Sequence, residues 1–222
     1  MTEFVIKVLL SYLLGSVIGS LLVGRLRGGV DIRRLGSGNA GGTNALRTQG
    51  KSFAFWVMLI DIGKGWVATR VIAPLALPGL SSQLGAGAQQ THEWLPVACG
   101  IAVILGHIYP LWYGFRGGKG VATLVGVVLG LEPSLLLPML VTWLLAVVLF
   151  GFVGLASILA ATALAVAATV GTWEPRAPLL TFGVLTAMLI AFTHRFNIAR
   201  MRAGTEPRAR RLWLLGLRRG ST

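Results

Sequence analysis

Residues 35–44 read LGSGNAGGTN and form the one long polar, glycine-rich passage in a chain that is otherwise strongly apolar. The glycines allow backbone conformations with positive φ and a close approach of the chain to a ligand. Hydroxyl, amide and backbone N–H groups come from Ser37, Gly38, Asn39, Thr43 and Asn44,. Arg47 follows with a planar cation,. We interpret the passage as a phosphate-binding or oxyanion-binding loop at the start of a helix, with a solvated linker as the open alternative.

Composition defines the class of protein around this loop. The chain has 222 residues, of which 55% are hydrophobic and 12% charged, and its formal net charge is +13. These values are typical of a polytopic membrane protein and exclude a soluble domain. The cations flank apolar runs, so membrane topology and anionic lipid headgroups account for them. We therefore expect membrane lipids as partners, and no nucleic acid.

The apolar runs predict an all-α integral membrane protein with about seven transmembrane helices, some of them short. The expected spans cover residues 4–24, 53–77, 94–113, 121–131, 134–150, 153–170 and 178–193,. The run 121–131 would be only about 18 Å long, too short to cross the hydrocarbon core unaided. We expect one transmembrane domain over residues 1–206, a polar loop over 78–93, and a basic amphipathic interfacial tail over 207–222.

The charged loops predict the orientation. Most of the 20 Lys and Arg residues follow the first span, precede the fourth, or lie in the C-terminal segment. The positive-inside rule then places the N-terminus outside and the C-terminus in the cytoplasm. Under this topology the glycine-rich loop, the loop at 117–120 and the segment 194–197 all face the cytoplasm.

Two further segments carry candidate chemistry. A second glycine loop precedes the start of a helix, where free amides and a lysine suit phosphate; it consists of Gly117, Gly118, Lys119 and Gly120,. His194 is the best candidate for general acid–base catalysis, and Asn197 can donate to a developing oxyanion,. Three scattered histidines and few acidic residues predict no metal site, and no nucleotide-binding pattern is present,. We interpret the set as a site for group transfer between a lipidic and a phosphorylated substrate, with no cofactor.

Ionisable residues inside expected spans are candidates for supporting roles. Asp61 and Lys64 lie three residues apart on one helical turn, where they either neutralise each other or support the site,. His107 lies near the end of its expected helix, and we expect it to pack and form hydrogen bonds there without acting as a catalyst.

Three segments in this order resemble the bacterial acyl-phosphate:glycerol-3-phosphate acyltransferase family (PlsY). They are GSGNAGGTN at 36–44 with Arg47, GHIYP at 106–110 continuing to FRGGKGVAT at 115–123, and THRFNIAR at 193–200 followed by Glu206. The stretch DIGKG at 61–65 is also similar to the family's second-helix segment. Together the motifs are specific, and the resemblance covers about residues 4–206.

The resemblance implies an enzyme that transfers a fatty acyl group from acyl phosphate to the 1-hydroxyl of sn-glycerol 3-phosphate. The products would be lysophosphatidate and inorganic phosphate, as the first step of phospholipid biosynthesis at the bacterial inner membrane. It also implies that residues 117–120 bind glycerol 3-phosphate, and that Glu206 is structural. The residues needed for activity would be Ser37, Arg47, His194 and Asn197.

The chemistry of a mixed anhydride fits these roles, because phosphate is a good leaving group and no covalent enzyme intermediate is required. Our hypothesis is direct attack by the glycerol hydroxyl, with the departing phosphate held at Ser37, Thr43 and Arg47. The base is either His194 or a phosphate oxygen of a substrate, and the sequence leaves both open, as it does the oligomeric state, a monomer included.

Two alternatives to an enzyme are a transporter and a lipid-binding scaffold. A transporter for an organic phosphate would also use glycine-rich helix breaks, but we find no inverted repeat, and the polar motifs gather on one face. A lipid-binding scaffold would leave His194 and Asn197 without a purpose. The acyltransferase is the favoured interpretation.

Overall fold

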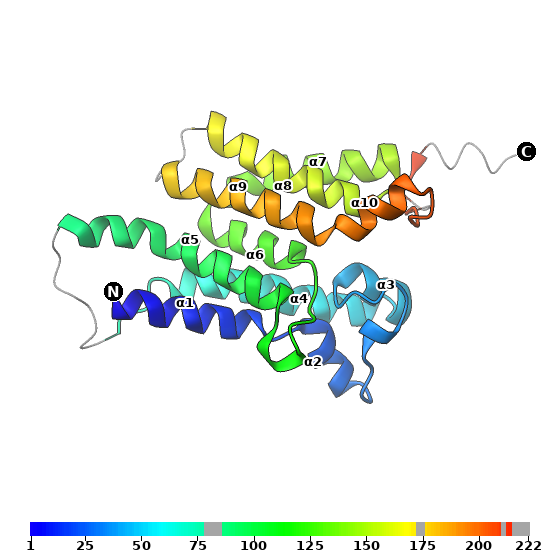
Figure 1. Ribbon diagram of the computed structural model, residues 1–222, viewed down its shortest axis with the longest axis horizontal. Coiled ribbons are helices and arrows are strands. Elements are labelled where there is room, and N and C mark those ends of the chain that lie inside the picture. The colour runs from blue at the N-terminus through cyan, green and yellow to red at the C-terminus, as the bar shows by residue number, and fades with distance from the viewer. Residues whose placement is uncertain (78–85, 172–175, 210–211, 215–222) are drawn as a thin grey trace, which may run out of the picture. The chain divides into compact units, whose positions relative to one another are not determined.

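The computed structural model describes residues 1–77, 86–171, 176–209 and 212–214. Every regular element in these residues is a helix and none is a strand, which confirms the predicted all-α fold (Figure 1). The chain forms two compact units, Met1–Glu132 and Pro133–Thr222. Each unit is described separately.

The described residues of the first unit form six α-helices and three short helical turns. Its elements are α1 (Thr2–Gly15), α2 (Gly19–Leu26), the 3-10 helix η1 (Ile32–Arg34), α3 (Gly42–Gln49), α4 (Lys51–Val67), the π-helix η2 (Ala68–Ile72), α5 (Ala86–Ile108), the 3-10 helix η3 (Leu111–Tyr113) and α6 (Val121–Leu131). Helix α1 packs along α5, and α4 packs along α6 (Figure 1). Helices α2 and α3 both contact α4, so the two glycine-rich loops belong to one packed body.

Glycines bring the helices of the first unit into close contact. A Cβ on Gly126 of α6 would meet the backbone carbonyl of Ile62, and a Cβ on Gly65 of α4 would meet that of Thr123. Gly106 of α5 fits against the backbone of α1 in the same way. Small residues at such positions let helix backbones approach closely, as is common between membrane helices.

The second unit is a short bundle in which α8 is the central helix. Its elements are the 3-10 helix η4 (Pro133–Leu135), α7 (Leu136–Phe150), α8 (Val153–Val170), α9 (Arg176–Thr193) and α10 (Arg195–Arg202). Helix α8 packs against both α7 and α9. Its buried residues are mostly small, namely Gly154, Ala156, Ser157, Ala160, Ala161, Leu164 and Ala168. This explains why its sequence is so rich in alanine.

The part of the tail that is described docks on the C-terminal end of α7. The amide of Ala209 donates to the carbonyl of Gly151 at 2.8 Å, and Trp213 Nε1 donates to the carbonyl of Leu149 at 3.2 Å. The Arg208 guanidinium lies 4.0 Å from the centroid of the Trp213 ring. Leu212 and Leu214 are exposed, while residues 210–211 and 215–222 of the predicted interfacial tail lie outside the described residues.

Among the described residues, four helical stretches are long and apolar enough to span a membrane: Glu93–Tyr113, Pro133–Phe150, Val153–Val170 and Arg176–Thr193. A fifth is possible if α1 and α2, bent by 48° at their break, form one span. Helix α6 is a short apolar helix with the predicted bounds, 121–131. The total of seven spans stays a prediction.

Three local predictions were wrong. The first span is not one continuous helix over 4–24, because the chain breaks between Gly15 and Gly19. Residues 86–93 begin α5 instead of belonging to a loop, and residues 78–85 of that loop lie outside the described residues. The helix expected after the glycine-rich loop was placed from residue 53, whereas a separate helix, α3, already begins at Gly42, and no helix was expected at α10. Both helices are polar and have 8 residues, so neither has the long apolar period that marks a helix in a sequence,.

Candidate active site

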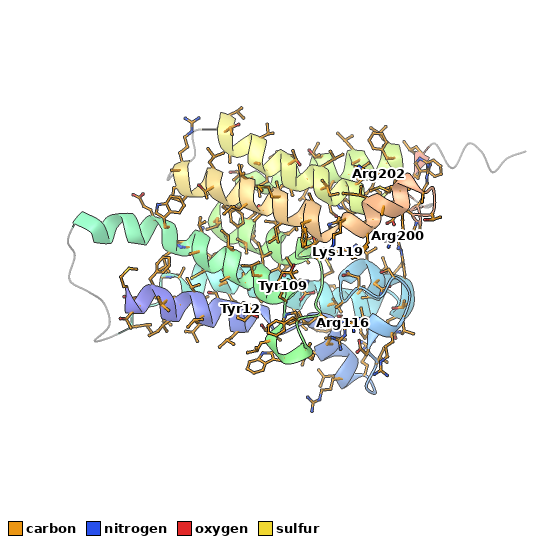
Figure 2. All side chains as sticks on the ribbon, viewed as in Figure 1. Tyr12, Tyr109, Arg116, Lys119, Arg200 and Arg202 are labelled. Carbon is orange, nitrogen blue, oxygen red and sulfur yellow. The ribbon has the colours of Figure 1, made fainter. Side chains whose placement is uncertain are left out.

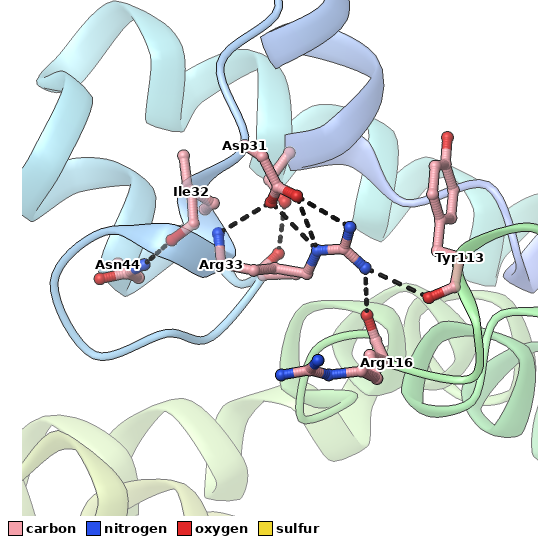
Figure 3. Close-up of polar contacts among 8 residues, drawn as sticks. Asp31, Ile32, Arg33, Asn44, Tyr113 and Arg116 are labelled. Atoms are coloured by element: carbon pink, nitrogen blue, oxygen red, sulfur yellow. Dashed lines mark hydrogen bonds and ion pairs between the residues drawn. The ribbon is translucent and has the colours of Figure 1, made fainter.

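Asn44 organises the first glycine-rich loop from inside. Its side chain is buried, and Nδ2 donates to the carbonyls of Ile32 at 2.9 Å, Leu35 at 3.0 Å and Asn39 at 3.0 Å. Its Oδ1 accepts the amide of Ser37 at 3.0 Å. Figure 3 shows the bond from Asn44 to Ile32. The structure therefore uses the amide of Asn44, which was expected to bind substrate, to hold the loop closed.

Most of the other predicted residues in and after this loop are exposed, whereas Asn39 is half-buried. Ser37, Thr43 and Arg47 are exposed, and Thr43 and Arg47 lie four residues apart on one face of α3,. Helix α3 is preceded by Gly41, which has no side chain to cap it, and the first amide bonded within the helix is that of Ala45, to the Gly41 carbonyl at 3.0 Å. The first amides of α3 thus have no partner within the helix, as at phosphate-binding helix starts.

Positive φ angles shape the loop before α3. Gly38 has φ of 72° and Gly36 has φ of 56°. A Cβ on Gly36 would also meet the side-chain oxygen of Asn44. A residue other than glycine at position 36 would be strained and would push Asn44 out of place.

The second glycine loop is built on the end of α5. The amide of Gly117 donates to the carbonyl of Ile108 at 3.1 Å, and the amide of Gly118 donates to the carbonyl of His107 at 3.0 Å. A Cβ on Gly118 would meet the imidazole of His107. Gly120, with φ of 86°, precedes α6 and provides no side-chain cap, so α6 starts like α3. Lys119 is half-buried on this loop, and Arg116, which precedes the loop, is exposed (Figure 2).

A buried polar cluster lies beneath the second loop. Lys64 Nζ is 2.9 Å from Asp61 Oδ1 and 2.8 Å from His107 Nδ1. It also donates to the carbonyls of Gly15 at 3.1 Å and Val17 at 2.7 Å. These are the carbonyls that the break between α1 and α2 leaves without helical partners. The cluster therefore stabilises the break and, because the His107 carbonyl accepts the amide of Gly118, also supports the second loop.

The third segment belongs to the second unit. His194 is buried, and its Nδ1 lies 2.8 Å from the carbonyl of Ile190. A carbonyl only accepts, so Nδ1–H donates, and in the neutral imidazole Nε2 then has the lone pair. Asn197 Nδ2 donates to Glu206 Oε1 at 2.6 Å, and Arg200 Nε donates to Glu206 Oε2 at 2.7 Å. Glu206 thus makes the kind of contacts that a structural role requires.

The predicted residues therefore divide between the units. The first unit contains both glycine loops, Arg47 and the buried cluster, whereas His194, Asn197 and Glu206 belong to the second. Within the first unit, Tyr12 Oη of α1 donates to the carbonyl of Tyr109 at 2.7 Å, which attaches α1 to the turn after α5 (Figure 2). In the residues that the structure describes, no group of three or more His, Cys, Asp and Glu residues could hold a metal ion.

Sequence reasoning missed one residue, Arg33, which counts in the sequence only as one of the cations after the first span. Its side chain reaches from η1 to the turn before the second glycine loop (Figure 3). The available signal is the sequence Asp31-Ile32-Arg33, in which the carboxylate accepts the amide two residues later and can orient the arginine,.

The chain is similar to known proteins of one family. A family model described as glycerol-3-phosphate acyltransferase matches residues 5–204. A glycerol-3-phosphate acyltransferase of Chlorobaculum parvum is 36% identical, with 94% of this chain and 97% of that protein covered. One from a Synechococcus species is 39% identical, covering 96% of this chain and 98% of that protein.

Solved structures of PlsY (YgiH), an integral membrane glycerol 3-phosphate acyltransferase, are also similar. The glycerol 3-phosphate form superposes with a TM-score of 0.79 and the lysophosphatidic acid form with 0.76, each at 34% identity over 92% of this chain and 94% of the other. Fold and comparisons together define the class as an all-helical integral membrane acyltransferase. The chain belongs to the glycerol-3-phosphate acyltransferase family, which confirms the resemblance seen in its motifs.

Proposed function

We propose that this acyltransferase takes its acyl group from acyl phosphate and transfers it to the 1-hydroxyl of sn-glycerol 3-phosphate. The products are lysophosphatidate and inorganic phosphate. The observation that carries the proposal is the pair of glycine-preceded helix starts, α3 and α6, in one packed unit, each with a nearby cation, Arg47 and Lys119. Two anionic substrates that would otherwise repel each other require two such sites. The related PlsY structures are a glycerol 3-phosphate form and a lysophosphatidic acid form, in keeping with this acceptor and this product.

The first loop is the proposed donor site. The phosphate of the acyl phosphate is held by the first amides of α3, the Ser37 hydroxyl, Thr43 and Arg47. Gly38 and Asn39 shape the loop around it, and Asn44 keeps the loop closed. These donors stabilise the charge that the phosphate gains as it departs.

The second loop, Gly117 to Gly120, is the proposed acceptor site. The first amides of α6 and the Lys119 ammonium bind the phosphate of glycerol 3-phosphate. The 1-hydroxyl oxygen then attacks the acyl carbon, a C–O ester bond forms, and the C–O bond to phosphate breaks. The hydroxyl proton passes to a base, and inorganic phosphate leaves.

Two bases remain candidates for that proton. His194 suits the role because its Nδ1–H donates to the Ile190 carbonyl, so that in the neutral imidazole the lone pair is on Nε2,. A phosphate oxygen of a substrate is the other candidate. Asn197, fixed by Glu206, is the proposed donor to the oxyanion of the tetrahedral intermediate,.

We further propose that the enzyme is a multi-pass protein of the bacterial inner membrane with its active site facing the cytoplasm. The charged loops support this orientation by the positive-inside rule,. The acyl chain of the donor would lie between helices within the membrane, and lipids would surround the apolar helix faces.

The donor is tested with detergent-purified protein, radiolabelled glycerol 3-phosphate, and either palmitoyl phosphate or palmitoyl-CoA. We expect labelled lysophosphatidate from palmitoyl phosphate alone. Equal product from palmitoyl-CoA would contradict the proposed donor. Uptake of phosphate into vesicles without acyl product would instead indicate a transporter.

The acceptor site is tested with Lys119→Gln. Loss of a charge-assisted phosphate contact should raise KM for glycerol 3-phosphate by about tenfold or more and leave KM for palmitoyl phosphate nearly unchanged. Lys51→Gln, at an exposed lysine at the start of α4, is the matched control and should behave as wild type. An unchanged acceptor KM in Lys119→Gln would contradict the assignment of this loop.

A further inference from the structure

We propose that Arg33 is a positioning residue that fixes the acceptor loop, residues 117–120, to the donor loop, residues 35–44. The names donor and acceptor rest on the proposed function, whereas the physical link between the two loops does not. Arg33 lies two residues before the donor loop, and its guanidinium reaches the backbone that leads into the acceptor loop.

The guanidinium bonds to two carbonyls of that backbone. Arg33 Nη1 donates to the carbonyl of Tyr113 at 3.2 Å and to that of Arg116 at 3.1 Å (Figure 3). Arg116 directly precedes Gly117, whose amide begins the acceptor loop. Both ends of the turn at 113–116 are therefore held by one side chain. The amides of Tyr113 and Phe115 also donate to the Pro110 carbonyl, at 3.2 Å and 3.0 Å, while Gly114, Phe115 and Arg116 are exposed.

Asp31 keeps the guanidinium in this orientation. Arg33 Nε lies 3.0 Å and 3.2 Å from the two carboxylate oxygens, and Nη2 lies 2.8 Å from Oδ2. The amide of Arg33 also donates to Asp31 Oδ1 at 3.0 Å. A planar fork bonded on one edge to a carboxylate is pre-oriented, so Nη1 loses less entropy when it binds the carbonyls.

The other end of the link is fixed to the donor loop. Ile32 is fully buried, and its carbonyl accepts Nδ2 of Asn44, the residue that closes the donor loop. Asn44 also holds the carbonyl of Leu35. The segment 31–35 is thus attached to the donor loop by Asn44 and to the acceptor loop by Arg33.

This arrangement favours positioning over direct binding of substrate. The described bonds engage all three nitrogens of the guanidinium with protein oxygens, so the fork is not presented to a phosphate. If Arg33 served only to orient the protein in the membrane, it would need no bonds to Asp31 or to the two carbonyls. The consequence for catalysis is geometric: transfer requires reacting atoms about 3–3.5 Å apart, and a shift of about 1 Å reduces the rate about 100-fold.

The test compares Arg33→Ala with Arg34→Ala in the full-length protein. Arg34 is the neighbouring, exposed arginine, so the control removes the same charge without touching the link. The first readout is amide hydrogen exchange at Gly117 and Gly118, whose bonds to α5 report on the acceptor loop without reference to activity. We expect exchange to be about tenfold faster in Arg33→Ala, since two charge-assisted hydrogen bonds are lost, and unchanged in Arg34→Ala.

The second readout is kinetic and independent of the fraction of active enzyme. KM for glycerol 3-phosphate should rise by about tenfold in Arg33→Ala, with a smaller rise in Arg33→Lys, which keeps the charge and loses the fork. KM for palmitoyl phosphate should change less. If Arg33→Ala does not fold, Asp31→Asn, which frees the guanidinium while preserving its charge, should shift exchange and acceptor KM in the same direction.

The outcomes separate this proposal from the proposed function. Unchanged exchange at Gly117 and Gly118 in Arg33→Ala would overturn the link, whatever the activity. Equal acceleration in Arg34→Ala would also overturn it, because the effect would then be one of charge alone. The acceptor assignment is tested separately by Lys119→Gln. If that assignment fails, the exchange result and the link between the loops still stand.

Discussion

Ser37 and Asn44 illustrate how residues of one polar passage divide between chemistry and shape. Asn44 is buried with its amide engaged by the loop, whereas the Ser37 side chain is exposed and only its backbone amide is bonded to Asn44. The sequence predicted both as phosphate ligands because it shows which groups are present and not which way they face. The direction of each side chain depends on where α3 begins.

Ser37→Ala tests the proposed phosphate-holding hydroxyl. We expect kcat to fall by about 100-fold to 1,000-fold, as for loss of one donor to a developing oxyanion. The unfolding midpoint should not change, because the hydroxyl is exposed. Ser52→Ala, which removes another exposed hydroxyl, is the control. A Ser37→Ala enzyme with near-normal kcat would contradict the role.

The Asp31–Arg33 pair makes a prediction about pH. The Arg33 guanidinium, through its side-chain hydrogen bonds, holds the pKa of Asp31 below its ordinary value. With a depressed native pKa, the pair's stabilisation is complete above the unfolded pKa of about 3.9 and is lost as the pH falls through the native pKa. Unfolding midpoints of wild type and Asp31→Asn should therefore differ by a constant amount from about pH 8 to about pH 5, and converge below about pH 4. A difference that varies between pH 8 and pH 5 would count against the pair as its source.

Among the helices, the sequence predicted correctly the bounds of those that are continuous apolar runs. The helices at 121–131 and 153–170 have the predicted bounds, since each is an apolar run between turn signals. The polar helices α3 and α10 could not be predicted in this way, because short helices depend on tertiary contacts for stability. Helix α3 contacts α4, and α10 contacts α8 and α9,. The break in the first span was missed for a similar reason: its carbonyls are satisfied by Lys64, which is distant in sequence.

The buried cluster should behave as a unit. Lys64→Met removes the partner of Asp61 and of two carbonyls at the break, and loss of one member of a buried ion pair costs about 3–5 kcal/mol,. Adding Asp61→Asn should recover part of this loss. Unfolding in detergent would measure the stability of Lys64→Met, of Asp61→Asn and of the double variant. A double variant as unstable as the sum of the two single variants would contradict the coupling.

The close contact between α4 and α6 can be tested with two glycines, one inside the contact and one outside it. Gly126→Ala forces a methyl group against the Ile62 carbonyl of α4, where only backbone movement can relieve it, so we expect a loss of about 1–3 kcal/mol or more,. Gly63→Ala on α4 meets nothing within 4 Å and should gain about 0.5–1 kcal/mol from helix propensity,. Equal stability of the two variants, measured by unfolding in detergent, would refute the close α4–α6 contact.

For the whole molecule, composition identified a membrane protein, and three motifs in order identified the family that the comparisons confirm. The motifs alone could not show that Asn44 closes one loop, that His107 supports the other, or that Arg33 joins them. Each of those contacts links segments separated by other elements, and only the folded chain reveals them. The residues that the motifs did predict lie on both compact units.

The most direct test of the account is phosphate release from palmitoyl phosphate by the purified protein, with and without glycerol 3-phosphate and with no metal added. We predict release only when glycerol 3-phosphate is present, with one lysophosphatidate formed for each phosphate. Such coupling follows from direct attack of the glycerol hydroxyl on the acyl carbon. Release of phosphate without the acceptor, or without matching lysophosphatidate, would contradict the account.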